Sequence, residues 1–202
     1  SLFSDSTSQE LTVSGGLTSF DSDGFTLGYD STAIVNATGN NYVSWNWLAG
    51  GTAVSNTDGS ITSSVSANTE AGFSIVGYTG DGAASGTVGH GLSSAPDMII
   101  IKNRDTARNW TVYHSANTSA PETDFLHLNT TNATQDGDGA FNDTAPTSTV
   151  FSIGTSDNVN KLSDDYIAYC FHSVEGYSKF GSYTGNGSSD GTFVYTGFRP
   201  AW

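Results

Sequence analysis

The sequence predicts an all-β protein made of antiparallel β-sandwich units of jelly-roll type, related by internal duplication, with little or no helix. Glycine accounts for 24 of the 202 residues, and glycine together with β-branched threonine and valine disfavours helix interiors. No stretch sustains the 3.6-residue apolar period of an amphipathic helix. Short apolar or alternating runs instead recur between glycine, asparagine and aspartate residues, which is the pattern of strands joined by turns.

These runs are the expected strands. Each contains β-branched or aromatic residues and is bounded by residues that favour turns. In chain order they are Gly24–Gly28, Tyr42–Trp47, Phe73–Tyr78, Met98–Lys102, Trp110–Tyr113, Phe125–Leu128, Val150–Ile153, Tyr166–Phe171, Tyr177–Tyr183 and Thr192–Tyr195.

The charge of the chain excludes two classes of partner. Twenty acidic and six basic side chains give a formal net charge of -14. Nucleic-acid binding by phosphate neutralisation needs clustered lysine and arginine, so no nucleic-acid partner is expected. Because lysine and arginine are so few, the chain also lacks a polybasic segment that would attract it to anionic membranes. The longest apolar run, Met98–Ile101, is far shorter than the roughly 20 residues that a membrane span needs, so no membrane insertion is expected.

The single cysteine, Cys170, excludes an intramolecular disulfide framework. It lies in the alternating run Tyr166–Phe171, which favours a small buried hydrophobe over a nucleophile.

The chain repeats itself. The run Tyr78–Val88, Tyr-Thr-Gly-Asp-Gly-Ala-Ala-Ser-Gly-Thr-Val, returns as Tyr183–Phe193, Tyr-Thr-Gly-Asn-Gly-Ser-Ser-Asp-Gly-Thr-Phe. A second, weaker correspondence links the N-terminal part to later segments. It pairs Gly24–Gly28 with Val150–Gly154, and Asn41–Trp47 with Asp165–Phe171. One duplication with one insertion accounts for both correspondences.

The order of the repeated pieces predicts three units. Residues 1–77 are the later part of a first unit, with a polar insertion near residues 50–69. Residues 78–182 are a complete sandwich unit, and residues 183–202 begin a further one. The last piece stops before a counterpart of the Met98–Lys102 strand. We therefore expect that the natural chain extends beyond Trp202 or that another segment supplies the strand.

Several long runs resemble an uncharacterised β-rich domain of large bacteriophage structural proteins. They are Ser22–Gly28, Tyr42–Gly51, Val88–Leu92, Asn109–His114 and Glu175–Gly187. In those proteins the domain often follows a concanavalin A-like (LamG-type) jelly roll, in marine phages especially. The resemblance implies a virion component, such as a tail fibre, a tail-associated protein or a surface decoration. It brings no catalytic residues with it.

Enzymatic residue patterns are absent from the sequence. Glycoside hydrolysis needs two facing carboxylates, but the four glutamates are scattered and most aspartates lie in turn-like contexts. No Gly-x-Ser-x-Gly elbow occurs, and no histidine pair has a metal-ligand spacing. His90 corresponds to Tyr195 in the repeat, which favours a packing or turn-supporting role. No catalytic residue is therefore expected.

Two short acidic runs are candidate calcium sites. Asp21 and Asp23, and likewise Asp136 and Asp138, alternate with small residues, as carboxylates do at the start of a calcium-binding loop. The bidentate glutamate of such a loop is missing from both, because Thr32 and Thr147 occupy its position. Ordinary turns are the alternative, and no other cofactor is implied.

The tryptophans are candidate platforms for glycan binding. Trp45 and Trp47 have the same parity in one expected strand and align with Tyr169 and Phe171, so core packing is expected for both. Trp110 is the better candidate for exposure. Together with the nearby Arg104 and Arg108 it forms the candidate glycan-contact set, although simple packing is the favoured role for Trp110.

The leading hypothesis is a non-enzymatic structural protein of a bacteriophage virion, assembled with copies of itself and with other virion proteins. Host-surface glycan is a further candidate partner. The alternative function is a carbohydrate-binding, lectin-like module of a secreted adhesin, which predicts exposed aromatic side chains beside asparagine or aspartate. A polysaccharide-degrading enzyme is a third reading, which requires a cleft with facing carboxylates.

Overall fold

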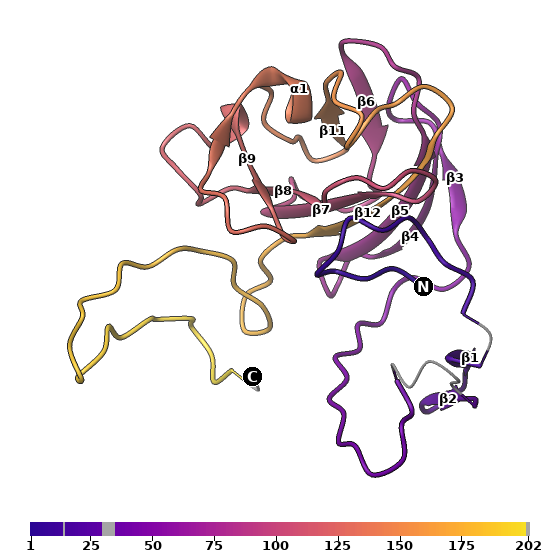
Figure 1. The fold of residues 1–202 in the computed structure, drawn as a ribbon. Helices are drawn as coiled ribbons and strands as arrows, with labels where there is room; N and C mark the ends of the chain where they lie inside the picture. The colour runs from indigo at the N-terminus through magenta and orange to yellow at the C-terminus, as the bar shows by residue number, and fades with distance from the viewer. Residues whose placement is uncertain (14, 30–34, 201–202) are drawn as a thin grey trace.

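The computed structural model describes residues 1–13, 15–29 and 35–200 and is dominated by one large antiparallel sheet (Figure 1). The eight strands of this main sheet are β3 (Val54–Asn56), β4 (Ser63–Asn68), β5 (Phe73–Thr79), β7 (Met98–Asn103), β8 (Thr111–His114), β9 (Asp124–His127), β10 (Gln135–Asp136) and β12 (Asp165–Phe171). Their order across the sheet is β10-β9-β8-β7-β12-β5-β4-β3.

A second layer covers one face of the main sheet. It contains β6 (Gly86–Gly89), its antiparallel partner β11 (Val150–Ile153), and the single helical turn α1 (Asp138–Phe141). A 3₁₀ turn, η1 (Pro121–Thr123), precedes β9. The all-β, antiparallel, sandwich-like prediction is confirmed.

The hydrophobic core lies between these two layers. On β12, the alternating residues Tyr166, Ala168 and Cys170 are fully buried, because successive side chains of a strand point to opposite faces. They belong to the same cluster as Val88 of β6 and Phe151 of β11. Full burial of a large apolar side chain contributes about 1.5–3 kcal/mol, so the sheet and its cover stabilise each other.

Residues 50–69, expected to be a polar insertion, contribute β3 and β4 to the main sheet. The serines of β4 are compatible with burial because their hydroxyls are hydrogen-bonded. Ser63 Oγ donates to the carbonyl of Gly89 at 2.8 Å, and Ser66 Oγ donates to that of Gly51 at 2.7 Å.

The boundary expected between residues 77 and 78 falls inside β5 and does not separate two folding units. β5 pairs with β4 on one side and with β12 on the other. Strands from both sides of the boundary therefore share one sheet.

Three expected strands are wrong. Tyr42–Trp47, Tyr177–Tyr183 and Thr192–Tyr195 have no assigned strand, although Gly24–Gly28 does contain β2 (Phe25–Leu27), paired with β1 (Leu17–Phe20) in a hairpin. A strand needs a neighbour for its backbone groups. In the described residues 172–200, strand-type pairing is limited to the bridge between Val174 and Ser178.

The N-terminal segment, residues 1–13, lies against the main sheet (Figure 1). The Glu10 amide donates to the carbonyl of Arg104 at 2.8 Å, and Trp110 Nε1 donates to the carbonyl of Phe3 at 2.9 Å. Among the described residues, none of the helical segments has the length and apolar character to cross a membrane.

Candidate functional site

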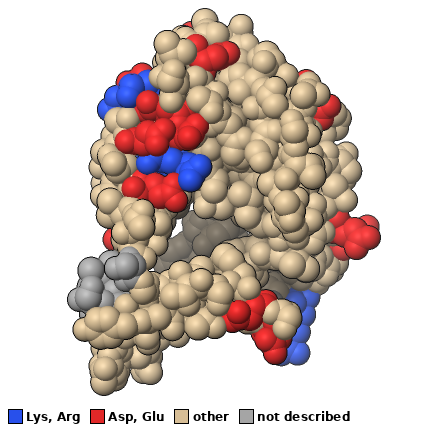
Figure 2. All heavy atoms as spheres, turned by 90° about the vertical axis from the view of Figure 1, so that its right-hand side faces the viewer, with Lys and Arg blue, Asp and Glu red and all other residues tan. Residues whose placement is uncertain are grey.

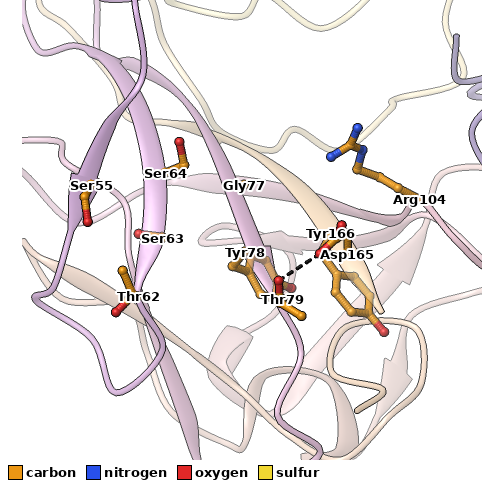
Figure 3. Close-up of a pocket in the computed structure, with 10 residues that line it drawn as sticks. All are labelled: Ser55, Thr62, Ser63, Ser64, Gly77, Tyr78, Thr79, Arg104, Asp165 and Tyr166. Carbon is orange, nitrogen blue, oxygen red and sulfur yellow. Dashed lines mark hydrogen bonds between the residues drawn. The ribbon is translucent and has the colours of Figure 1, made fainter. Parts of the chain in front are cut away.

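A hollow lined largely by hydroxyl groups lies over β3, β4, β5 and β12 (Figure 3). Its volume is about 400 Å³. Hydroxyl-bearing residues come from neighbouring strands and loops, and two charged residues, Arg104 and Asp165, lie at one side. The hydroxyl-bearing lining residues are Ser55, Thr62, Ser63, Ser64, Tyr78, Thr79 and Tyr166. The hydroxyls of Ser63, Tyr78 and Tyr166 are bonded to backbone carbonyls on the core side of the sheet. The hydroxyl groups available to a ligand are therefore those of Ser55, Thr62, Ser64 and Thr79.

The charged groups beside this hollow are already in contact with other groups. Arg104 Nε lies 2.6 Å from Glu10 Oε2, and this hydrogen bond raises the pKa of the guanidinium. Asp165 Oδ1 accepts a hydrogen bond from the Thr79 hydroxyl at 2.8 Å. The site therefore combines donors and acceptors suited to a polar, hydroxyl-rich ligand.

The two tyrosines of the hollow are poor acid–base groups near neutral pH. Burial raises the pKa of Tyr166 to about 12 and raises that of Tyr78 well above its usual range. Asp165 is the one carboxylate among the residues that line the hollow, whereas glycoside hydrolysis uses two. This geometry supports binding better than bond cleavage.

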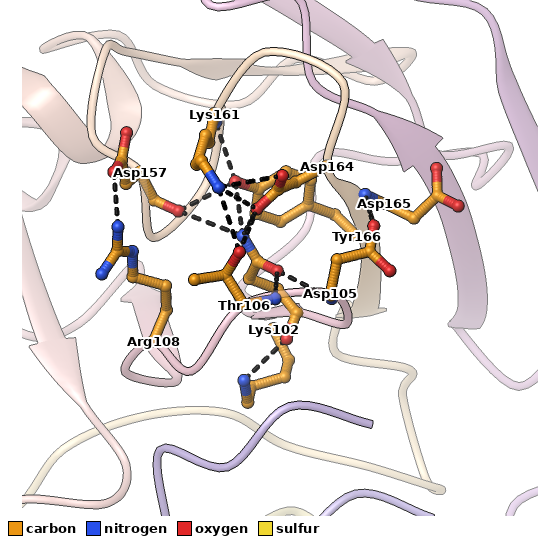
Figure 4. Close-up of polar contacts among 10 residues, drawn as sticks. Lys102, Asp105, Thr106, Arg108, Asp157, Lys161, Asp164, Asp165 and Tyr166 are labelled. Atoms are coloured by element: carbon orange, nitrogen blue, oxygen red, sulfur yellow. Dashed lines mark hydrogen bonds and ion pairs between the residues drawn. The ribbon is translucent and has the colours of Figure 1, made fainter. Parts of the chain in front are cut away.

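A cluster of hydrogen-bonded polar side chains, close to the hollow, fixes the loop before β12 (Figure 4). Asp164 Oδ2 accepts hydrogen bonds from Thr106 at 2.6 Å and Asn103 at 2.9 Å, and lies 3.1 Å from Lys161 Nζ. Burial alone would raise the pKa of Asp164, but these hydrogen bonds outweigh burial and lower it. The matched donors and acceptors give this cluster a structural role.

The structure does not bring the three candidate glycan-contact residues together around the hollow. Trp110 is only 5% exposed, so packing, the favoured expectation, is confirmed, and the ring is not an exposed glycan platform. Its ring packs beneath the N-terminal segment, where Nε1 is bound to Phe3. Arg108 Nη2 forms an ion pair with Asp157 at 2.6 Å, and of the three candidates Arg104 alone lines the hollow.

The expected packing of Trp45 and Trp47 in the core is also wrong, because both side chains are largely exposed. Trp47 nevertheless contacts the edge of the core, with its ring centroid 6.5 Å from that of Phe73 and 6.2 Å from that of Phe171.

The four candidate calcium ligands lie in two places, one between β1 and β2 and the other at β10 and α1. In the described parts of the chain, no group of three His, Cys, Asp or Glu side chains is placed to hold a metal ion. Asp21 instead accepts hydrogen bonds from Thr26 at 2.7 Å and Ser19 at 3.0 Å, which lower its pKa. Asp136 and Asp138 are exposed and lie on separate elements, β10 and α1.

His90 has the turn-supporting role that the repeat suggests. Its ring is buried; Nδ1 accepts a hydrogen bond from the Leu92 amide, and Nε2 lies 3.1 Å from the carbonyl of Thr147. A carbonyl only accepts, so Nε2 carries the proton and the ring is neutral. Burial lowers the pKa of His90. The expected burial of Cys170 is confirmed as well.

The residues that sequence reasoning missed are the hydroxyls of the hollow, including Ser55, Ser64 and Thr79, together with Asp165. Serine and threonine occur throughout this chain, so their identity carries no signal. Their convergence depends on the pairing of β4 with β5 and of β5 with β12.

The whole chain, residues 1–202, matches the family described as Domain of unknown function (DUF7483). The chain belongs to the DUF7483 family. No curated protein and no solved structure matches it. For this DUF7483 member, the arguments about function therefore come from its residues and their geometry.

Charged side chains of both signs gather in parts of one side of this DUF7483 chain, while other acidic groups on that side have no basic neighbour. Figure 2, which faces the side of β3 and the β1–β2 hairpin, shows lysine and arginine side chains next to acidic ones, and wide areas without charge. The surface is also hollowed between the main body and the segment below it.

Proposed function

We propose that this chain is a non-enzymatic structural component of a bacteriophage virion, in a tail fibre, a tail-associated protein or a capsid-surface decoration. The resemblance of its long sequence runs to a domain of phage structural proteins supports this proposal. So does the all-β fold, whose main sheet and second layer form a packed scaffold.

One structural observation carries the proposal: large aromatic side chains are exposed on the segments outside the packed sandwich. They are Phe20, Tyr29, Trp45, Trp47, Tyr183, Phe193 and Tyr195. Aromatic side chains are enriched on surfaces that bind other proteins. A building block of a particle needs such surfaces, whereas an enzyme needs converging catalytic groups, and Asp165 is the one carboxylate lining the hollow.

The test is the location of the chain in intact particles. Antibodies raised against the purified protein are applied to particles of the phage that encodes it, and bound antibody is imaged by electron microscopy. Labelling at fixed, symmetric positions is expected. Particles that lack the chain, with the chain recovered instead from the medium of uninfected cells, would refute a virion role and favour a secreted adhesin.

A second function, glycan binding, is favoured by the hydroxyl-lined hollow. Arg104 and Asp165 beside several serine and threonine hydroxyls offer both donors and acceptors to a sugar. On a glycan array, the variant Ser64→Tyr, which fills the hollow from an exposed position of β4, should abolish binding. Arg108→Gln, which lies outside the hollow, is the control. Equal binding by both variants would exclude this hollow as the glycan site.

A further inference from the structure

The sequence repeat assigns a structural counterpart to each of two exposed segments. Gly191–Val194 corresponds to Gly86–Gly89, which forms β6, and Gly24–Leu27 corresponds to Val150–Ile153, which forms β11. In the sandwich, β6 and β11 pair antiparallel, with Val88 opposite Phe151. The two exposed segments are therefore the sequence equivalents of two strands that bind each other.

Burial differs sharply between the two sets of positions. Val88 and Phe151 are both 0% exposed, whereas their counterparts Phe193 and Phe25 are 86% and 37% exposed. Burying such side chains stabilises a strand pair. The exposed segments thus carry the residue types of a buried strand pair without its contacts.

The backbone of β2 has one edge available for pairing. In the described residues, β2 pairs with β1 along one edge and with no strand along its other edge. Gly191–Val194 is outside any assigned strand. An exposed edge of this kind accepts an added strand through main-chain hydrogen bonds.

Charge does not oppose an approach between these segments. The runs Gly24–Tyr29 and Gly191–Phe198 contain no charged residue, although the chain has a formal net charge of -14. The paired residues themselves therefore add no charge repulsion, although Asp23 and Asp190 flank the two segments.

The arrangement of the two segments within one chain points to a second copy as the partner. Figure 1 shows the β1–β2 hairpin and the C-terminal segment apart from each other below the main sheet, with the chain around residues 35–50 between them. A second copy can present its hairpin to the C-terminal segment, whereas pairing within one chain would require these separated segments to move together.

We propose that Gly191–Val194 of one copy adds as an antiparallel strand to the free edge of β2 in a second copy, in the register of β6 and β11. The register places Val194 opposite Gly24, Phe193 opposite Phe25, Thr192 opposite Thr26 and Gly191 opposite Leu27. Because the two paired surfaces are different, the contact is head to tail and generates a ring or an open fibre. This inference deepens the proposed structural function. It rests on that proposal, because a component of a particle must associate with copies of itself.

Cysteine cross-linking tests the register between chains. Thr192→Cys and Thr26→Cys chains are purified separately, mixed and oxidised; the native Cys170 is buried and does not compete. The mixture should give a covalent dimer on a denaturing gel. Thr192→Cys mixed with Thr18→Cys, on β1, is the matched control and should stay monomeric. A dimer in both mixtures, or in neither, would overturn the proposed register.

A second measurement separates association from folding. The unmodified chain should gain at least twofold in apparent mass with rising concentration in sedimentation equilibrium, and Phe193→Asp should abolish this gain without changing the thermal midpoint. Ser188→Asp, exposed and outside the pair, is the control and should still associate. A monomer at all concentrations would overturn the inference, as would an intrachain disulfide in the Thr26→Cys/Thr192→Cys double variant. These association measurements do not decide whether antibodies label intact particles. The proposed virion function can therefore hold even if the strand pairing between copies is refuted, and the reverse is also possible.

Discussion

The rings of Tyr78 and Tyr166 stack face to face, 5.1 Å apart and 11° from parallel, across the paired strands β5 and β12. Their hydroxyls reach the loop that precedes β12. Tyr78 donates to the carbonyl of Val159 at 2.8 Å, and Tyr166 donates to that of Asp157 at 2.8 Å. The pair therefore connects the centre of the sheet to the loop that carries Asp164.

Removing the Tyr166 hydroxyl should destabilise the protein. In Tyr166→Phe the part-buried amide of Lys161 loses its acceptor and the carbonyl of Asp157 loses a donor, at a cost of about 1–3 kcal/mol. Urea unfolding followed by circular dichroism measures the change. Tyr177→Phe is the control, because Tyr177 is exposed. An equal loss in both variants would show that the hydroxyl network has no special role.

Stability should fall in acid through His90. Because burial lowers the pKa of His90 in the folded state, the unfolded chain binds a proton first as the pH falls. The stabilisation is therefore complete above the ordinary pKa of 6.5 and is lost as the pH falls through the lower folded value.

The variant His90→Asn tests this pH dependence, because asparagine keeps an acceptor for the Leu92 amide but does not titrate. Urea unfolding at a series of pH values from 7 to 5 should show a smaller decline for the variant than for the unmodified chain. Parallel declines would assign the acid sensitivity to other groups.

Trp110 should behave as a buried side chain. Its replacement by alanine should lower the free energy of unfolding by about 3–5 kcal/mol. Fluorescence provides a direct measurement: a chain with Trp110 as its one tryptophan should be quenched several-fold less by acrylamide than a chain that retains only Trp45, which is exposed. Similar quenching of the two chains would contradict the burial of Trp110.

The thiol of Cys170 should be unreactive in the folded protein. Burial raises its pKa to about 12, so thiolate is scarce at neutral pH and reagent has no access. Ellman's reagent should detect this thiol in urea but not in native buffer. A Ser188→Cys chain should react under native conditions, which confirms that the assay works. Rapid native reaction of the unmodified chain would show that the core opens around β12.

Sequence reasoning located most strands of the sandwich because their side chains alternate. Tyr166–Phe171 predicts β12, and Val150–Ile153 coincides with β11. It failed for β4 because Ser63 and Ser66 are polar yet buried, each with its hydroxyl bonded to a backbone carbonyl. Hydrophobic patterning does not detect a buried residue of this kind.

The opposite error, predicting strands at Tyr42–Trp47 and Thr192–Tyr195, has a different cause. Both runs have high intrinsic β propensity, but propensity does not provide a partner strand. The same non-local dependence hid the hydroxyl-lined hollow, whose residues come from strands far apart in the chain. Packing was the favoured expectation for Trp110, but no local pattern links this residue to Phe3, whose carbonyl accepts the hydrogen bond of its Nε1.

The position of β12 has a consequence for how the protein is made. β5 and β7 both pair with β12, yet β12 is the last strand of the sheet to be synthesised. Until residue 171 has left the ribosome, the nascent chain has two incomplete half-sheets, each with an unpaired inner edge. Pairing so distant along the chain is slow to form, and open edges invite aggregation. Chaperone protection during translation should therefore matter more for this fold than its modest size suggests.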